Sequence, residues 1–319
     1  MTSRIALCFA TNLSLDRMIY EVSHRTSYRY ESTVTQSQHL IHLAPRASAR
    51  QIVQRHMLLI EPTPTWRDDF TDYFGNPTSV LGIDNEHREL ILHARSTIEV
   101  ISRDHVDVEQ GVGWDEARRW ITASNHEIDL DVAQYALPSP ATPTSEAVMA
   151  YAKPSFVPRR PVLAVAWELT NRIFDDFTFD SQATDVTTPV VEVLNKRRGV
   201  CQDFAHVALA CFRAYRVPAR YVSGYILTKP PPGMPRLQGA DASHAWVSVW
   251  APETGWVDFD PTNRLIPSDE HITYAYGREY ADISPISGVL LGGGQHYVEV
   301  GVDVVPVTTP RREKADSGP

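Results

Sequence analysis

Three residues of the chain have the types that acyl transfer through a thiol requires: Cys201, His244 and Asp260. A cysteine nucleophile needs a base that moves its proton, and the base is held in turn by a third polar group. Such a set cleaves an amide by forming an acyl-enzyme on sulfur. Whether the three side chains can meet depends on the elements that carry them.

Cys201 is expected at the first turn of a helix over residues 201–215. The dipole and the unpaired N–H groups of a helix N-terminus favour a thiolate and offer donors to an oxyanion. Asp203 is expected to cap this helix, whereas Cys211, in the middle of its apolar face, is interpreted as an inert core residue. The apolar face is formed by residues at helical spacing: Phe204, Val207, Ala208, Cys211, Phe212 and Tyr215.

His244 and Asp260 lie on the two predicted strands of one hairpin. The first strand alternates strictly between polar or aromatic and apolar residues, and a Pro-Glu-Thr-Gly turn signal follows it. If Trp250 pairs with Trp256, His244 is diagonal to Asp260 on the same face, which brings an imidazole and a carboxylate within reach. Asp258 has the same parity as Asp260 and is the competing partner of His244.

Three neighbours of this set are candidate substrate-binding residues: Trp246, Tyr225 and Gln202. Aromatic side chains and an amide beside a nucleophile could hold a peptide segment. For Trp246 an alternative remains open, because a tryptophan on this strand could equally stack beneath the hairpin.

The remaining histidines give no metal-binding pattern. His206 is five residues after Cys201 and so points away from it on a helix, which disfavours it both as the base and as a metal ligand with the predicted triad. His39 and His42 could pair on a metal, but their surroundings match no zinc motif. We therefore expect no metal and no cofactor.

Composition limits the class of protein and its partners. The 319 residues suggest about two domains, and the net charge of −9 disfavours a nucleic-acid partner. No apolar run approaches the roughly 18 residues of a membrane span, so no membrane partner is expected. Three cysteines form no disulfide framework, which favours a reducing, cytoplasmic location.

The pattern along the chain predicts an α+β protein. From Met18 to about residue 100 the dominant period is two, as in Tyr20, Val22, Tyr28 and Tyr30, which indicates a β-sandwich-like domain. Met18 is an alternative start, because the strand pattern begins directly after it. The expected divisions are an extension (1–17), a β-rich domain (18–105), a helical transition (106–160), a core that includes C-terminal strands (161–307) and a disordered tail (308–319).

Several motifs also resemble the bacterial transglutaminase-like superfamily. The resemblance implies a papain-like core whose Cys-His-Asp triad maps onto Cys201, His244 and Asp260, after a β domain of the same family. The segments that carry it are Arg198–His206, Pro218–Tyr225, Ser243–Trp246 and Phe259–Asn263 in the core, Tyr20–Tyr30 and Leu43–Arg46 before it, and Tyr274–Asp282 after it.

The predicted function is thiol-dependent acyl transfer at an amide bond of a protein or peptide. If water accepts the acyl group, the protein is a cysteine peptidase or amidase; if an amine accepts it, the protein is a transglutaminase. Hydrolysis is favoured because water is abundant and no feature marks a dry amine site. A non-enzymatic binding module with a relic triad is the third reading. The oligomeric state and the substrate are not set by the sequence.

Overall fold

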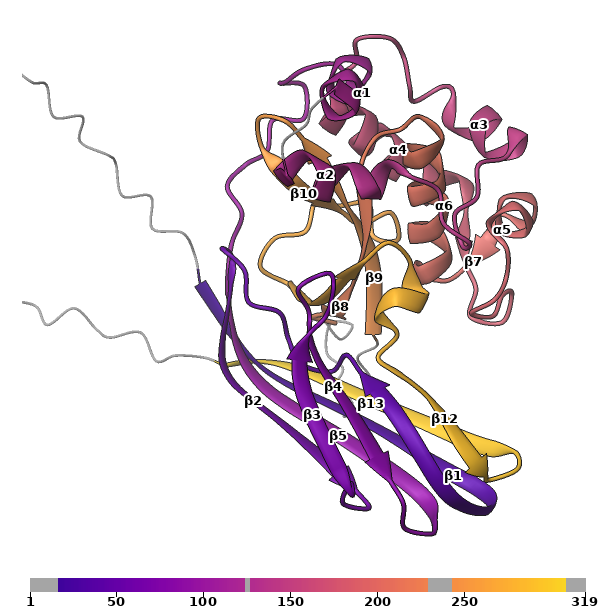
Figure 1. Ribbon diagram of the computed structural model, residues 1–319. Coiled ribbons are helices and arrows are strands. Elements are labelled where there is room, and N and C mark those ends of the chain that lie inside the picture. The colour runs from indigo at the N-terminus through magenta and orange to yellow at the C-terminus, as the bar shows by residue number, and fades with distance from the viewer. Residues whose placement is uncertain (1–16, 124–126, 229–242, 308–319) are drawn as a thin grey trace, which may run out of the picture.

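The computed structural model describes residues 17–123, 127–228 and 243–307, and it shows an elongated molecule with a sheet at one end and helices at the other (Figure 1). The third cysteine, Cys8, the expected extension before residue 17, the expected tail after residue 307 and the Pro-rich segment Pro230–Gly233 lie outside these residues. None of the described helices is long and apolar enough to cross a membrane.

The N-terminal part is a seven-stranded antiparallel sheet built around one long strand, β1. The first half of β1 pairs with β5 and β13, and its second half pairs with β4 and β12. The strands are β1 (Arg17–Ile41), β2 (Gln51–Glu61), β3 (Trp66–Thr71), β4 (Pro77–Ile83), β5 (His87–Ile101), β12 (Ile286–Gly292) and β13 (His296–Val307).

Alternating burial explains this sheet. Tyr20, Val22 and Tyr30 are buried on β1, as their shared parity predicts, and Leu90 and Leu92 are buried on β5. The C-terminal strands expected near the end of the chain are present, but they join the N-terminal sheet instead of the core. The reason is the length of β1, whose 25 residues offer one edge to β13 and then to β12.

The helices gather at the other end of the molecule (Figure 1). Two of them follow a proline, because proline is tolerated at a helix N-terminus: Pro161 precedes α4, and Pro189 precedes α5. The helices are α1 (Trp114–Ala123), α2 (Glu127–Ala133), α3 (Glu146–Ala152), α4 (Val162–Asp176), α5 (Val190–Lys196) and α6 (Cys201–Ala214), with 3₁₀ turns at Gln134–Ala136 and Tyr280–Ile283.

A four-stranded antiparallel sheet lies between the helices and the N-terminal sheet. Its strand order is β10-β9-β8-β11, and a two-stranded parallel pair, β6 with β7, leads into α6. Ala245, Val247 and Val249 of β9 share one hydrophobic core with the apolar face of α6. The strands are β6 (Thr178–Phe179), β7 (Arg198–Gly199), β8 (Ala219–Ile226), β9 (Ser243–Ala251), β10 (Gly255–Phe259) and β11 (His271–Gly277).

Side-chain amides join the two sheets along β11. Gln51 of β2 donates to the carbonyl of Thr273 at 2.6 Å and accepts the N–H of the same residue at 2.9 Å. Asn76 repeats the pattern at Tyr276, with both distances 2.8 Å. Both amides therefore bond to the backbone of an edge strand, so the two sheets are held by directional contacts as well as by apolar packing.

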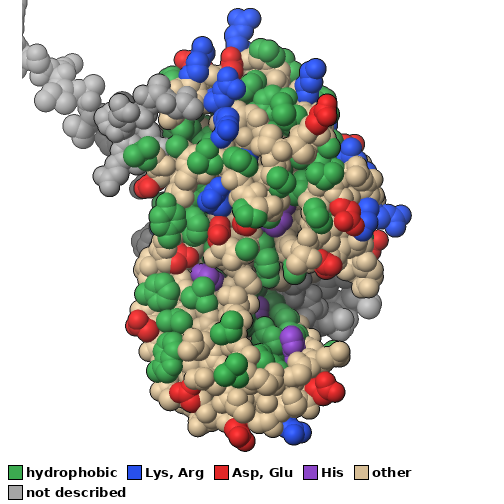
Figure 2. Space-filling model, turned by 45° about the vertical axis from the view of Figure 1, so that its right-hand side comes forward, with side chains coloured by type: hydrophobic (Ala, Val, Ile, Leu, Met, Phe, Trp, Pro, Cys, Tyr) green, Lys and Arg blue, Asp and Glu red, His purple; other side chains and the backbone are tan. Residues whose placement is uncertain are grey.

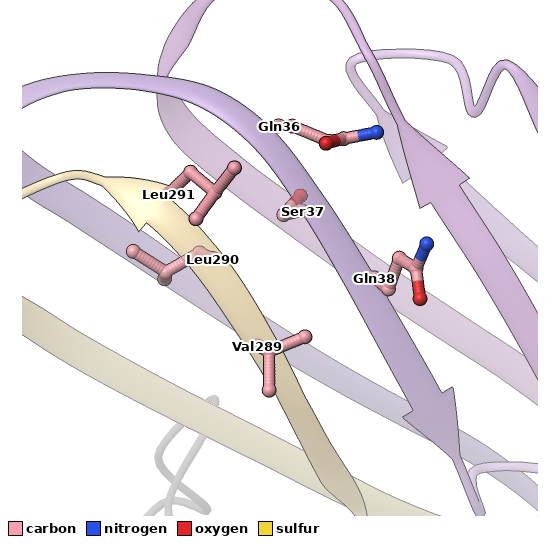
Figure 3. Close-up of a pocket in the computed structure, with 6 residues that line it drawn as sticks. All are labelled: Gln36, Ser37, Gln38, Val289, Leu290 and Leu291. Carbon is pink, nitrogen blue, oxygen red and sulfur yellow. The ribbon is translucent and has the colours of Figure 1, made fainter.

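The surface of the N-terminal sheet carries scattered apolar side chains (Figure 2). A pocket on this sheet lies between β1 and β12 and contains none of Cys201, His244 and Asp260 (Figure 3). Its walls are Gln36, Ser37, Gln38, Val289, Leu290 and Leu291.

Candidate active site

The first turn of α6 holds Cys201 at the mouth of the core. Cys201 is partly exposed, and among the described residues no group accepts a hydrogen bond from its backbone N–H. Asp203 caps the helix as expected, since its carboxylate accepts the Val200 N–H at 2.8 Å and the Thr184 hydroxyl at 2.6 Å. A Cβ atom on Gly199 would lie 2.5 Å from that carboxylate, so the hydrogen bond from Val200 to Asp203 requires glycine at position 199.

The hairpin register brings His244 to Asp260. Trp250 pairs with Trp256, as the alternation predicts, and His244 Nε2 lies 2.7 Å from Asp260 Oδ2. Asp258, the competing partner, instead accepts the indole N–H of Trp246 at 3.2 Å. Asp260 is therefore the carboxylate that orients His244.

His244 is the central group of the site and is 8% exposed. Burial acts to lower the pKa of His244. The hydrogen bonds to Asp260 and Cys201 and the charges of these two groups outweigh burial and raise the pKa from 6.5 to about 10. Because Nε2 faces Asp260, the other ring nitrogen, Nδ1, is the one left for Cys201. Both contacts thus favour the charged imidazole, which lies between the Cys201 sulfur and the Asp260 carboxylate.

Two further residues hold Asp260, and the sequence reasoning assigned neither a role. His271 Nε2 lies 3.0 Å from the same Oδ2 atom, and Asn263 Nδ2 donates to it at 2.7 Å. The other oxygen accepts the backbone N–H groups of Thr262 and Asn263 at 2.9 and 3.1 Å. Burial raises the pKa of Asp260, but the hydrogen bonds from His244 and His271 and the charges of both imidazoles hold it well below its usual range.

Trp246 lies beneath the two imidazoles. It has no exposed surface, and its ring meets that of His271 edge-on at 5.1 Å between centroids. Gly224, which pairs with His244 across β8 and β9, makes this packing possible. A side chain on Gly224 would lie 2.6 Å from the Trp246 ring and 2.1 Å from the Ile272 carbonyl oxygen.

The candidate substrate-binding residues occupy three different environments. Gln202 is partly exposed beside Cys201, and its amide donates to the Val186 carbonyl at 3.3 Å. Trp246 is fully buried beneath the triad, which agrees with the alternative that it stacks under the hairpin and does not line a substrate groove. Tyr225 is 4% exposed and packs against His24 and Tyr274 between the two sheets, so the structure does not bring it to the triad.

One cluster of described residues has the donor atoms of a metal site: His244, Asp260 and His271, whose nitrogen and oxygen atoms lie within 4.8 Å of one another. Both imidazole Nε2 atoms already hydrogen-bond to the Asp260 Oδ2 atom. His206 lies elsewhere, as expected, because its Nε2 accepts the Tyr280 N–H at 3.2 Å. Burial lowers the pKa of His206 to about 4, which fits this neutral acceptor role.

A helix-terminal cysteine, a strand histidine and an aspartate on the neighbouring strand, on an α+β core, define a papain-like class of protein. Residues 20–99 match the model of the bacterial transglutaminase-like N-terminal region, and residues 151–261 match that of the transglutaminase-like superfamily. The chain belongs to the bacterial transglutaminase-like proteins.

Two relatives and a solved structure match most of the chain. An uncharacterised protein of Mycobacterium tuberculosis is 40% identical over 299 residues, which cover 90% of this chain and 92% of the relative. An uncharacterised protein of Mycobacterium leprae is 30% identical over 89% of this chain and 97% of its own. A candidate cysteine protease of Cytophaga hutchinsonii has the same fold, with a TM-score of 0.71, 20% identity and 92% of both chains covered.

Proposed function

We propose that the protein is a thiol-dependent acyltransferase that cleaves amide bonds and passes the acyl group to water. The observation that carries this proposal is the position of His244, which hydrogen-bonds to both the helix-terminal Cys201 and the buried Asp260. Nucleophile, base and orienting group are thus in contact, which is the arrangement that covalent acyl transfer needs. The expected substrate is a protein or peptide in a reducing, cytoplasmic compartment.

The reaction follows from the roles of these three groups. His244 holds the proton of the Cys201 thiol, so the thiolate sulfur attacks the amide carbon, and the free N–H of Cys201 donates to the oxyanion that forms. His244 gives its proton to the amide nitrogen, the C–N bond breaks, and an amine leaves behind a thioester on Cys201. His244 then takes a proton from water, the hydroxide attacks the thioester, and the acid and the thiolate are released. Asp260 holds the imidazole in the required tautomer throughout.

Transfer to an amine is the second candidate. A protein-glutamine gamma-glutamyltransferase of Pseudomonas aeruginosa is 35% identical to 94 residues of this chain, which make up 29% of this chain and 12% of that protein. The same thioester would then be opened by a primary amine instead of water, and the product would be a new amide.

One partition experiment separates the two acceptors. The protein is incubated with a glutamine-containing peptide library and rising concentrations of a primary amine, and free acid and amide products are quantified. Acid that dominates at high amine supports hydrolysis, whereas saturable amide formation at low amine supports the transglutaminase. Cys201→Ala is the control. Turnover that persists in this variant contradicts both thiol mechanisms, whereas no turnover in either protein leaves the binding module.

A further inference from the structure

A second pocket lies at the junction of the two sheets, behind the triad. Its volume is about 360 Å³, and it opens to solvent through partly exposed side chains. The N-terminal part contributes Ser48, Ala49, Arg50, Gln51, Val100 and Arg103, and the core contributes Arg220, Thr254, Trp256, Asp258, His271, Thr273 and Tyr276. We call it the interdomain arginine pocket.

Three guanidinium groups line this pocket, and each has a buried N–H that lacks a hydrogen-bond acceptor. The atoms are Arg50 Nη1, Arg103 Nε and Arg220 Nε. A buried donor without a partner is energetically costly, and more so when it is charged. The protein therefore supplies too few acceptors for the guanidinium groups that line this pocket.

The charges in the pocket are not balanced by the protein. Asp258 is the only carboxylate among the lining residues, and it accepts a hydrogen bond from Trp246. Among the described residues, none of the three arginines lies within 4.0 Å of the Asp258 carboxylate. Three cations thus face one anion, which leaves an excess of about two positive charges.

The arginine at the centre of the pocket is held in place before any ligand arrives. The guanidinium carbon of Arg220 lies 3.5 Å from the ring centroid of Tyr276 and 4.2 Å from that of Trp256. Arg103 is fixed by a 3.3 Å hydrogen bond from Nη2 to the Trp256 carbonyl. Planar, positioned guanidinium groups suit the oxygens of a phosphate, to which they donate in pairs.

We propose that the interdomain arginine pocket binds a phosphate group, either inorganic phosphate or a small phosphate monoester. The charge of such a group, about −1.5 to −2 at neutral pH, matches the excess of positive charge. Because both parts of the chain supply arginines, the ligand clamps the two sheets together. The site is distinct from the thiol chemistry, although His271 lines the pocket and also contacts Asp260.

The test is calorimetric titration of the Cys201→Ala protein with inorganic phosphate and with glycerol phosphate, at constant ionic strength. We expect saturable binding and a rise of the melting temperature with phosphate concentration. Arg103→Gln and Arg50→Gln each weaken binding ~10-fold or more, because each removes a charged donor. Arg55→Gln is the matched control, since it makes the same charge change on an exposed part of β2 outside the pocket, and it leaves affinity unchanged.

A variant that is expected to strengthen phosphate binding keeps the test independent of folding defects, because a folding defect would weaken binding. Asp258→Asn removes the only lining carboxylate, keeps an acceptor for Trp246, and is expected to tighten phosphate binding several-fold. The proposal is overturned if phosphate causes no saturable signal, if chloride at equal ionic strength reproduces it, if Arg55→Gln weakens it as much as Arg103→Gln, or if Asp258→Asn leaves it unchanged or weaker. A dicarboxylate such as succinate that binds more tightly than phosphate also overturns it. Measuring binding on Cys201→Ala separates this outcome from any failure of the proposed catalysis.

Discussion

Replacing Asp260 by asparagine tests the charge arrangement of the triad directly. The rise of the His244 pKa from 6.5 to about 10 corresponds to about 5 kcal/mol in favour of the imidazolium. This is the combined effect of Asp260 and Cys201 after the opposing cost of burial. Asparagine keeps the shape of the side chain but removes its charge. If its amide nitrogen faces His244, it is a donor and cannot accept the imidazole N–H.

We therefore expect Asp260→Asn to lower kcat/KM by ~10³- to 10⁴-fold at neutral pH. The basic limb of the pH profile should also move, because it reports loss of the His244 proton. In the wild type this limb is expected near pH 10, and in Asp260→Asn it should fall toward the ordinary histidine value of about 6.5. The assay is kcat/KM against pH on an amide substrate, with Asp104→Asn, on an exposed loop, as a charge-matched control.

Stability gives a second readout with a defined sign. A raised pKa of His244 in the folded state stabilises the fold fully below pH 6.5, and this stabilisation is lost as pH rises to about 10. Urea denaturation should show this slope in the wild type and little of it in Asp260→Asn. A basic limb that stays near pH 10 in the variant, together with an unchanged stability slope, would refute the reasoning.

Three further predictions follow from the same contacts. Brief alkylation at neutral pH should label Cys201 and not Cys211, which is fully buried with its pKa raised by burial to about 12, and mass spectrometry of the peptides checks this. His271→Phe should lower the free energy of unfolding by about 1–3 kcal/mol and reduce kcat more than it changes KM, because one donor to buried Asp260 is lost; equal kinetics in both proteins would contradict this. Deletion of residues 1–100 should give a chain that fails to fold cooperatively by circular dichroism, since β12 and β13 lose their partner β1.

The part of the site that lies on one hairpin could be predicted from the sequence. A strict alternation on β9 and a short turn leave few registers, so the choice of Asp260 over Asp258 needed no tertiary information. His271 could not be found in this way, because β11 lies at the opposite edge of the sheet from β10. The two side chains meet because the segment between Asp260 and His271 crosses from one edge of the sheet to the other, and the path of this segment cannot be read from alternation.

Alternating residue types show which side chains share a face of a strand. They do not show whether that face is exposed or covered by another element. Trp246 and Tyr225 have the residue type expected of a substrate groove, yet both are buried, one beneath the triad and one between the sheets. The same limit explains the C-terminal strands. Their pattern predicts strands, but the strand with which they pair depends on the length of β1, which leaves an open edge more than 240 residues away along the chain.

The amides of Gln51 and Asn76 do for β11 what a fifth strand would do. An edge strand presents a row of unsatisfied backbone groups, and such rows are templates for pairing with another molecule. Here two side chains from the other sheet occupy the outward N–H and carbonyl groups of Thr273 and Tyr276. The N-terminal part therefore prevents β11 from pairing with another molecule. The core expressed by itself would expose β11 as an open edge on which a second copy could pair and aggregate.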